Sequence, residues 1–310
     1  MKELVRRKLI DSGAAAVGFA KAGEVHSGVS DAFNKWIGEG RHAEMDYLRR
    51  HVPLRRHTDN VLPGARTVIS LAFSYAPQSW RDSSLPSVAA YAYGSDYHFV
   101  LRQRLQPIVN ELQDQFGGNW RICIDSAPLE ERYWALKAGL GIRGKNGSVI
   151  VEGCGSLCFL AEILTTLEID PDEPSLKECN GCGACVSACP SSALNGDGTI
   201  DSRLCLNYLS IEKKGEFSDW EKELISRYPV FLGCDRCLKA CPHNCETTPS
   251  EIEEFRLSPL VEGLSSRSIS LMNDKEFRRM FKNTPFERIK LKGLKRNAGV
   301  SFEDETPSDS

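Results

Sequence analysis

The residues most able to do chemistry are cysteines, and they gather in one short part of the chain. Eight of the twelve cysteines in this 310-residue sequence lie between Cys179 and Cys241. Disulfides are rare where thiols are kept reduced, and the charged first twelve residues do not resemble a signal peptide. We therefore interpret the cysteine-rich part as a metal-binding segment.

The first cysteine motif is a C-x2-C-x2-C-x3-C-P run: Cys179, Cys182, Cys185, Cys189 and Pro190. This run is typical of bacterial ferredoxins with two [4Fe–4S] clusters, in which the fourth cysteine binds the other cluster. Gly181 and Gly183 permit the left-handed turns that a loop around a cluster needs. A zinc site is the alternative, but zinc ribbons pair two C-x2-C knuckles and this run fits them poorly.

The second motif has the same ending but lacks one cysteine, and Cys205 is the natural substitute. Exchanging the last cysteine of each motif predicts two sets of four ligands. The first set is Cys179, Cys182, Cys185 and Cys241. The second set is Cys189, Cys205, Cys234 and Cys237. Cys245 could replace Cys241, but Pro242 argues for Cys241 because Pro190 follows the last cysteine of the first motif. Cys123, Cys154 and Cys158 are expected to be small core residues.

An α+β fold must position these motifs. Helical patterns at 2–11, 31–50, 96–116 and 128–140 alternate with apolar strand patterns at 14–20, 67–75 and 121–125. Two further strand patterns, 148–153 and 156–169, are expected to pair as a hairpin that turns at Gly153 and Gly155. The predicted units are an α/β layer (1–170), a two-cluster ferredoxin-like domain (171–248), a basic helical segment (249–300) and a disordered acidic tail (301–310).

Composition bounds the class of protein. Hydrophobic residues make up 41% and charged residues 26% of the chain, as in globular proteins. The sequence has no apolar run of about 18 residues, so we expect a cytoplasmic protein without a membrane span. We also expect a monomer.

Charge is distributed unevenly. Residues 275–296 contain nine Lys or Arg and two Glu, a net charge of +7, whereas the whole chain carries −3 and the remainder therefore −10. Such a local excess predicts a surface for polyanions, with a solvated helix face as the alternative. The candidate phosphate-binding residues are Arg288, Lys290, Lys292, Lys295 and Arg296.

The chain resembles the epoxyqueuosine reductases, cobalamin-dependent iron–sulfur enzymes of queuosine biosynthesis in tRNA. The resemblance covers about residues 1–297. Besides both cysteine motifs, it rests on LPGARTVISLAFSY (62–75), YAYGSDYHFVLRQRL (91–105), DSAPLEERYWALKAGLGIRGKNGSVIV (125–151), CLNYLSIE (205–212) and PFERIKLKGLKRN (285–297). Many family members continue into a helical-repeat extension, whereas this chain ends soon after Asn297.

The resemblance implies an activity and a second cofactor. The family removes the epoxide oxygen of epoxyqueuosine in the tRNA anticodon loop, and it uses cobalamin that receives electrons through the two clusters. The implied partners are tRNA carrying epoxyqueuosine and an external low-potential electron donor of the flavodoxin or ferredoxin type. The alternatives are a corrinoid reductive dehalogenase and a non-enzymatic two-cluster electron carrier.

Asp125 is the implied catalytic and cofactor-facing acid. It follows the strand pattern RICID, and functional side chains collect at strand ends in α/β layers. We expect burial beside the corrin to raise the pKa of Asp125, so that the carboxyl can protonate the epoxide oxygen. A cap of the following helix is the alternative role.

Five more residues are implied cofactor contacts: Arg56, Val149, Leu160, Asn207 and Asp235. A surface arginine is the alternative for Arg56, and ordinary core is the alternative for Val149 and Leu160 on the expected hairpin. Tyr97 and His98 are expected at the substrate mouth. Lys145 could bind a phosphate or solvate a loop.

Overall fold

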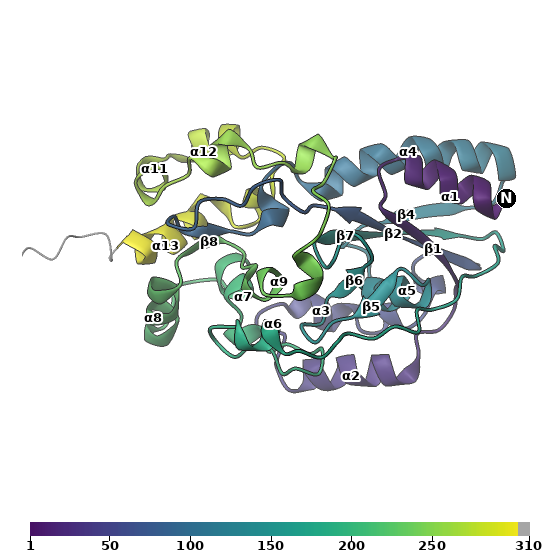
Figure 1. The fold of residues 1–310 in the computed structure, drawn as a ribbon, viewed down its shortest axis with the longest axis horizontal. Coiled ribbons are helices and arrows are strands. Elements are labelled where there is room, and N and C mark those ends of the chain that lie inside the picture. Colours follow the sequence, from purple (N-terminus) through teal and green to yellow (C-terminus); the bar gives the residue numbers. More distant parts are fainter. Residues whose placement is uncertain (303–310) are drawn as a thin grey trace, which may run out of the picture.

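The computed structural model describes residues 1–302 of the chain. The acidic tail predicted at 301–310 falls mostly on residues 303–310, which lie outside the described part. A four-stranded sheet forms the centre of the N-terminal region (Figure 1), in the order β1 (Ala16–Lys21), β2 (Thr67–Ser74), β7 (Cys158–Thr165) and β4 (Trp120–Cys123). Every neighbouring pair is antiparallel. The predicted α+β class is confirmed, with antiparallel rather than parallel strands in the layer.

Helices cover both faces of this sheet. On one face lie α1 (Lys2–Asp11) and α4 (Tyr97–Phe116), and on the other lies α5 (Glu131–Lys137). Side chains of β2 alternate between the two faces: Ile69, Leu71 and Phe73 join one apolar cluster, whereas Val68 and Ala72 join a second. A strand buried on both faces reads as a continuous apolar run, which is why β2 was recognisable in the sequence.

The predicted hairpin between 148–153 and 156–169 is wrong. Instead, β6 (Val149–Val151) pairs with β5 (Gly141–Arg143), and β7 pairs with β2 and β4. Near the expected turn, an isolated bridge joins Val151 to Gly155. Because β7 lies inside the sheet, both of its edges are already occupied. The partner β5 is short and glycine-flanked, so its sequence carries little strand signal.

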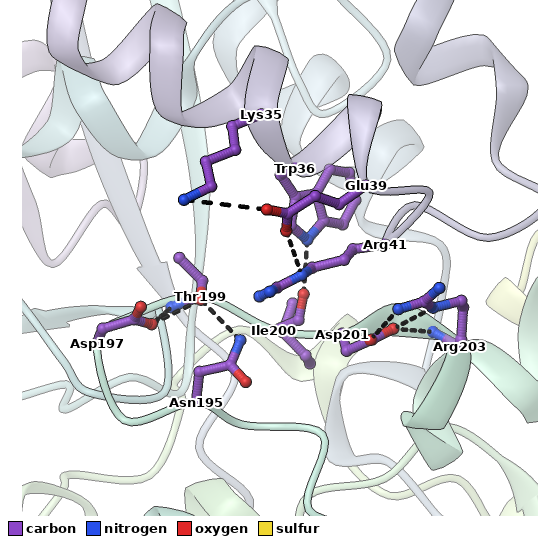
Figure 2. Close-up of polar contacts among 10 residues, drawn as sticks. All are labelled: Lys35, Trp36, Glu39, Arg41, Asn195, Asp197, Thr199, Ile200, Asp201 and Arg203. Carbon is purple, nitrogen blue, oxygen red and sulfur yellow. Dashed lines mark hydrogen bonds and ion pairs between the residues drawn. The ribbon is translucent and has the colours of Figure 1, made fainter.

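The cysteine-rich segment consists of short elements: α6 (Ala184–Ser187), α7 (Leu206–Ile211), α8 (Asp219–Arg227), β8 (Val230–Leu232) and α9 (Arg236–Lys239). β8 pairs in parallel with β3 (Ser87–Val88), which belongs to the N-terminal region. Figure 2 shows a second junction, where the Trp36 Nε1–H of α2 (Ser27–Gly38) donates to the Ile200 carbonyl at 2.6 Å. These contacts fix the segment against the sheet region.

The C-terminal part contains α10 (Pro259–Glu262), α11 (Ser266–Leu271), α12 (Asp274–Met280) and α13 (Lys290–Phe302). Its buried residues Phe277, Phe281 and Phe286 belong to the same apolar cluster as Ile69 of the sheet. The Asn297 side-chain amide donates to the carbonyls of Ser210 and Phe231 at 2.8 Å each, which joins α13 to α7 and β8. None of the helices within residues 1–302 combines the length and apolarity needed to cross a bilayer.

Candidate functional site

The structure gathers the first predicted ligand set around one cavity. Its lining includes Cys179, Cys182, Cys185 and Cys241, together with Lys145, Asn146 and Ile150. Gly181 and Gly183 have φ angles of 70° and 74°, which confirms the left-handed turns expected at these two glycines. Cys245 is exposed and does not line this cavity. The placement favours Cys241 over Cys245, whereas the ligand role itself stays a prediction.

The four thiols of the second predicted set are all half-buried. Burial raises the pKa of Cys237 to about 12, and the neighbouring thiols of Cys234, Cys205 and Cys189 act in the same direction. These four side chains therefore lie close enough to interact electrostatically. Within the described residues, no group of three or more His, Cys, Asp or Glu side chains is placed to hold a single metal ion. In a [4Fe–4S] cluster each thiolate binds a different iron atom, so its four ligands surround a wider space.

Cys182 and Asp235 mark the exposed and buried sides of the segment. Cys182, in the first set, is exposed. Asp235, beside Cys234, is only 7% exposed, and its Oδ2 accepts a hydrogen bond from the Ala90 N–H at 2.6 Å. Burial raises the pKa of Asp235 to about 6. We therefore call the first set the outer thiols and the second set the inner thiols.

Asp125 lies in the loop between β4 and α5. Its φ is 52°, a left-handed conformation that is uncommon for a residue with a Cβ. The rule that places functional residues at strand ends applies to parallel sheets and does not explain a loop in this antiparallel one. The cap position of α5 is occupied by Glu130, so the helix-cap alternative for Asp125 is wrong. Its carboxylate is 58% exposed and contacts His98 instead.

His98 links two carboxylates. Its Nδ1 lies 2.8 Å from Asp96 Oδ1, and its Nε2 lies 3.3 Å from Asp125 Oδ2. Asp96 also caps the start of α4, so the chain of contacts begins on a rigid element. Burial alone would lower the pKa of His98, but the hydrogen bonds to Asp125 and Asp96 raise it to about 9. His98 is therefore charged at neutral pH.

The pKa of Asp125 moves opposite to our expectation. The hydrogen bond from His98 is the main cause that lowers this pKa below its usual range, and it outweighs the raising effect of desolvation. A hydrogen bond from Tyr97 and the charge of Arg288 lower it further. The sequence could not supply this correction, because Asp96 and His98 are separated from Asp125 by most of α4 and by β4. The raised pKa of His98 and the lowered pKa of Asp125 both favour a proton on the imidazole and an ionised carboxylate.

Charged and aromatic side chains from several elements surround Asp125. Tyr47 comes from α3 (Asp46–His51), Arg55 from a 3-10 turn (Leu54–Arg56) and Arg288 from another (Pro285–Arg288). Burial raises the pKa of Tyr47, and the charges of Glu212, Arg288, Asp125 and Arg55 all influence it. The guanidinium of Arg288 binds Glu212 Oε1 at 2.6 Å. Tyr47 and Arg55 lie outside the motifs quoted from the sequence, and Glu212, the last residue of CLNYLSIE (205–212), was not singled out there.

The predicted cofactor contacts are placed unevenly. Arg56 is exposed, whereas its neighbour Arg55 is turned inward and donates to the Leu129 carbonyl at 3.1 Å. Val149 is buried and Leu160 is half-buried against the same apolar cluster, although they stand on different sheets rather than on paired strands. Asn207 is half-buried on α7.

Two other expectations concern Tyr97 and Lys145. Tyr97 stacks on Phe159 of β7, with ring centroids 4.2 Å apart, and faces Asp125. Its predicted place at the mouth of the substrate site stays a prediction. Lys145 lines the cavity of the outer thiols. This position is unrelated to the Asp125 site.

The basic C-terminal stretch divides into exposed and inward-facing residues. Lys290 and Lys292 are exposed and Lys295 is half-buried. The Arg296 guanidinium donates to the carbonyls of Lys213 and Leu209 at 2.7 and 3.0 Å and lies over the Phe217 ring. Arg296 therefore holds the end of α7, and its predicted role in phosphate binding does not agree with this position.

These features define the chain as a redox protein in which a cysteine-rich segment adjoins a site with a charged imidazole and a carboxylate. The family model described as 4Fe-4S double cluster binding domain matches residues 178–244. The model described as Epoxyqueuosine reductase QueG, DUF1730 matches residues 55–126, which include Asp96, His98 and Asp125.

Curated relatives extend the match to almost the whole chain. The epoxyqueuosine reductase of Cyclobacterium marinum is 38% identical over 266 residues, covering 84% of each chain. That of Leadbetterella byssophila is 34% identical, covering 94% of this chain and 96% of its own. The chain belongs to the epoxyqueuosine reductase family. This assignment favours the predicted epoxyqueuosine reductase over a corrinoid reductive dehalogenase or a non-enzymatic electron carrier.

Solved structures of similar proteins agree with the fold. The epoxyqueuosine reductase of Streptococcus thermophilus is 26% identical with a TM-score of 0.82, covering 97% of this chain and 80% of its own. An epoxyqueuosine reductase bound to an epoxyqueuosine-modified tRNA-Tyr stem loop is 25% identical with a TM-score of 0.86 and the same coverage. In the Bacillus subtilis enzyme, 25% identical with a TM-score of 0.84, a catalytic aspartate loop is swung out of the active site.

Proposed function

We propose that this chain reduces epoxyqueuosine to queuosine in the anticodon loop of tRNA. The observation that carries the proposal is the Asp96–His98–Asp125 chain, which ends in a carboxyl able to protonate an oxygen. The family assignment supplies the substrate, because its tRNA complex contains the epoxyqueuosine-modified stem loop.

The outer and inner thiols each supply four ligands for a [4Fe–4S] cluster. The donor set fits, because thiolates are the ligands such clusters prefer and eight thiols form two groups of four. Cys182 is exposed at the outer set, so the external electron donor, of the flavodoxin or ferredoxin type, docks at that side. The inner thiols lie toward Asp235 and the sheet.

The residues around Asp125 would hold a cobalamin. The surroundings fit such a group in two respects. Tyr97, stacked on Phe159, gives an apolar face beside Asp125, and Arg55 carries a buried Nε that has no hydrogen-bond partner in the described structure. Asn207 is the remaining predicted polar contact. When bound, cobalamin supplies a cobalt centre that can be reduced to a strongly nucleophilic state.

Proton balance assigns a task to His98. Conversion of an epoxide to an alkene consumes two electrons and two protons and releases one water molecule. Asp125 delivers one proton at a time to the substrate oxygen, so it must be reprotonated within each turnover. His98 holds a proton at Nε2, 3.3 Å from Asp125 Oδ2, and passes it to that oxygen. Substrate that covers Asp125 removes water from it and raises its proton affinity.

The exposed cations of the C-terminal stretch bind the tRNA backbone. Lys290 and Lys292 stand on the surface, and Arg288 extends the same stretch to the edge of the Asp125 site. A positive surface that ends beside the proton donor suits a substrate base carried on a phosphate chain. Arg296 is left out of this surface because its donors are used within the protein.

The test is conversion of modified tRNA. Anaerobically purified protein is incubated with epoxyqueuosine-containing tRNA, a low-potential reductant and cobalamin, and the digested nucleosides are analysed by mass spectrometry. We expect queuosine to form, and to require cobalamin. Loaded clusters and bound cobalamin without any queuosine would refute the proposed substrate.

A further inference from the structure

Two glutamates, the buried Glu162 and the half-buried Glu131, lie behind the Asp125 loop and have no part in the function proposed above. Glu162 on β7 is 0% exposed, and neither of its carboxylate oxygens has a hydrogen-bond partner among the described residues. Its neighbours across the sheet are Ser70 and Cys123. Burial of an ionised carboxyl without a partner is costly, so we expect the Glu162 carboxyl to be neutral in the folded protein.

Glu131 connects this buried position to Asp125. It is the first residue of α5, and its Oε1 accepts the backbone N–H of Asp125 at 2.5 Å. Asp125 adopts a left-handed conformation that side chains disfavour, so an interaction is needed to hold it there. This hydrogen bond to the Asp125 amide joins the loop to a rigid helix.

The two glutamates also influence each other. Burial raises the pKa of Glu131 to about 8, and the charge of Asp125 acts in the same direction. The pKa of Glu162 is raised well above its usual range, first by burial and then by Glu131. The titratable and charged groups that face Glu131 from the packed elements are Asp125, Arg55, Arg132, Glu162, Tyr97 and Cys123.

We propose that Glu131 is a positioning residue for the Asp125 loop, which it holds through the Asp125 backbone N–H, and that Glu162 stays protonated beneath it. A neutral Glu162 adds no negative charge beneath the Glu131 and Asp125 carboxyls. The role in turnover rests on the proposed function, whereas the hold on the loop does not.

The first experiment measures the loop itself. Amide hydrogen exchange is followed in fragments covering residues 123–130 of the intact protein. In Glu131→Ala the Asp125 amide should exchange about tenfold faster, and in Glu131→Gln, which keeps an acceptor oxygen, it should stay close to the parent rate. Glu130→Ala is the matched control, because Glu130 binds Arg55 and makes no contact with the Asp125 amide. Equal exchange in the parent and in Glu131→Ala would overturn the proposal.

Kinetics separate positioning from general damage. Glu131→Ala should lower kcat about tenfold or more, while the Kd for tRNA changes less than about twofold. Glu131→Gln should recover most of the lost kcat. An active parent with undiminished kcat in Glu131→Ala would refute the positioning role alone. An inactive parent would refute the proposed function, and the exchange result would still decide the hold on the loop.

The protonation of Glu162 has its own test. A carboxyl that is neutral when folded and ionised when unfolded destabilises the protein increasingly as the pH rises above its ordinary pKa of 4.5. The free energy of unfolding of Glu162→Gln, minus that of the parent, should therefore increase from about pH 5 to pH 8. A pH-independent difference would show that Glu162 is not held protonated.

Discussion

The cysteine segment and the Asp125 site are built in different ways. Seven of the eight predicted cluster ligands come from two short motifs, and only Cys205 stands apart. The groups around Asp125 come from α3, α4, α7 and two 3-10 turns, which are distributed over most of the chain. Metal chemistry can therefore be encoded by local spacing, whereas proton chemistry here depends on which distant charges the fold brings together.

The difference also affects how each region responds to substitution. Each predicted cluster needs all four of its thiolate ligands, so the loss of one cysteine should affect the whole cluster. The Asp125 site instead depends on graded electrostatic influences: His98 lowers the pKa of Asp125, while Asp96 and Asp125 raise that of His98. Variants of the two regions should consequently differ in both size and kind of effect.

The largest effect is expected from the outer thiols. Cys241→Ala should remove one cluster, lowering iron from about eight to about four atoms per chain, and should abolish turnover. Cys245→Ala is the matched control, because this exposed thiol lies outside the cavity. Iron analysis and electron paramagnetic resonance of the reduced protein provide the measurement. Iron loss in Cys245→Ala instead would reassign the ligand.

Replacing the proton donor should have the next largest effect. Asp125→Asn keeps the size of the side chain but cannot deliver a proton, so kcat should fall about 100-fold to 10,000-fold. Iron content and the Kd for tRNA should be unchanged. Asp114→Asn, at an exposed position of α4, serves as the control. A variant with full activity would remove Asp125 from the catalytic role.

His98 should give a pH-dependent effect. His98→Gln cannot store a proton, so kcat should fall about tenfold at neutral pH. Parent activity should decline as the pH rises through about 9, where His98 loses its proton, and the variant should lack this decline. The folded pKa lies above the usual 6.5, so the stabilisation from charged His98 is fully present below 6.5 and is lost through about 9. Identical pH profiles would exclude His98 from the proton pathway.

The smallest effect is expected at the basic surface. Charge reversal at Lys292 and Lys295 should weaken tRNA binding about tenfold at low salt and reduce the slope of log K against log salt by about one per lost phosphate contact. Cluster absorption should not change. The matched control is Lys222→Glu on α8, because Lys222 is exposed outside the basic stretch. Parallel salt dependences of the parent and the double variant would exclude this surface from tRNA binding.

Local patterns predicted much of the fold. Helix α1 begins and ends as expected, and α4 and β2 agree within a residue, because each has a clear apolar period or a fully buried run. The pairing of β6 and β7 was wrong, since period-two patterns identify strands without identifying their partners. The glycine-flanked β5 left no signal from which the correct partner could be found.

For the site, the sequence by itself predicted the thiols as ligands, their exchange between the motifs and a role for Asp125. It could do so because ligand spacing is a local property and because the family motifs are contiguous. Only the tertiary structure decided that Arg55 rather than Arg56 faces inward, that Arg296 holds α7 and that His98 lies between the carboxylates of Asp96 and Asp125. Burial and charge are set by residues far apart in the chain, so no spacing in the sequence records them.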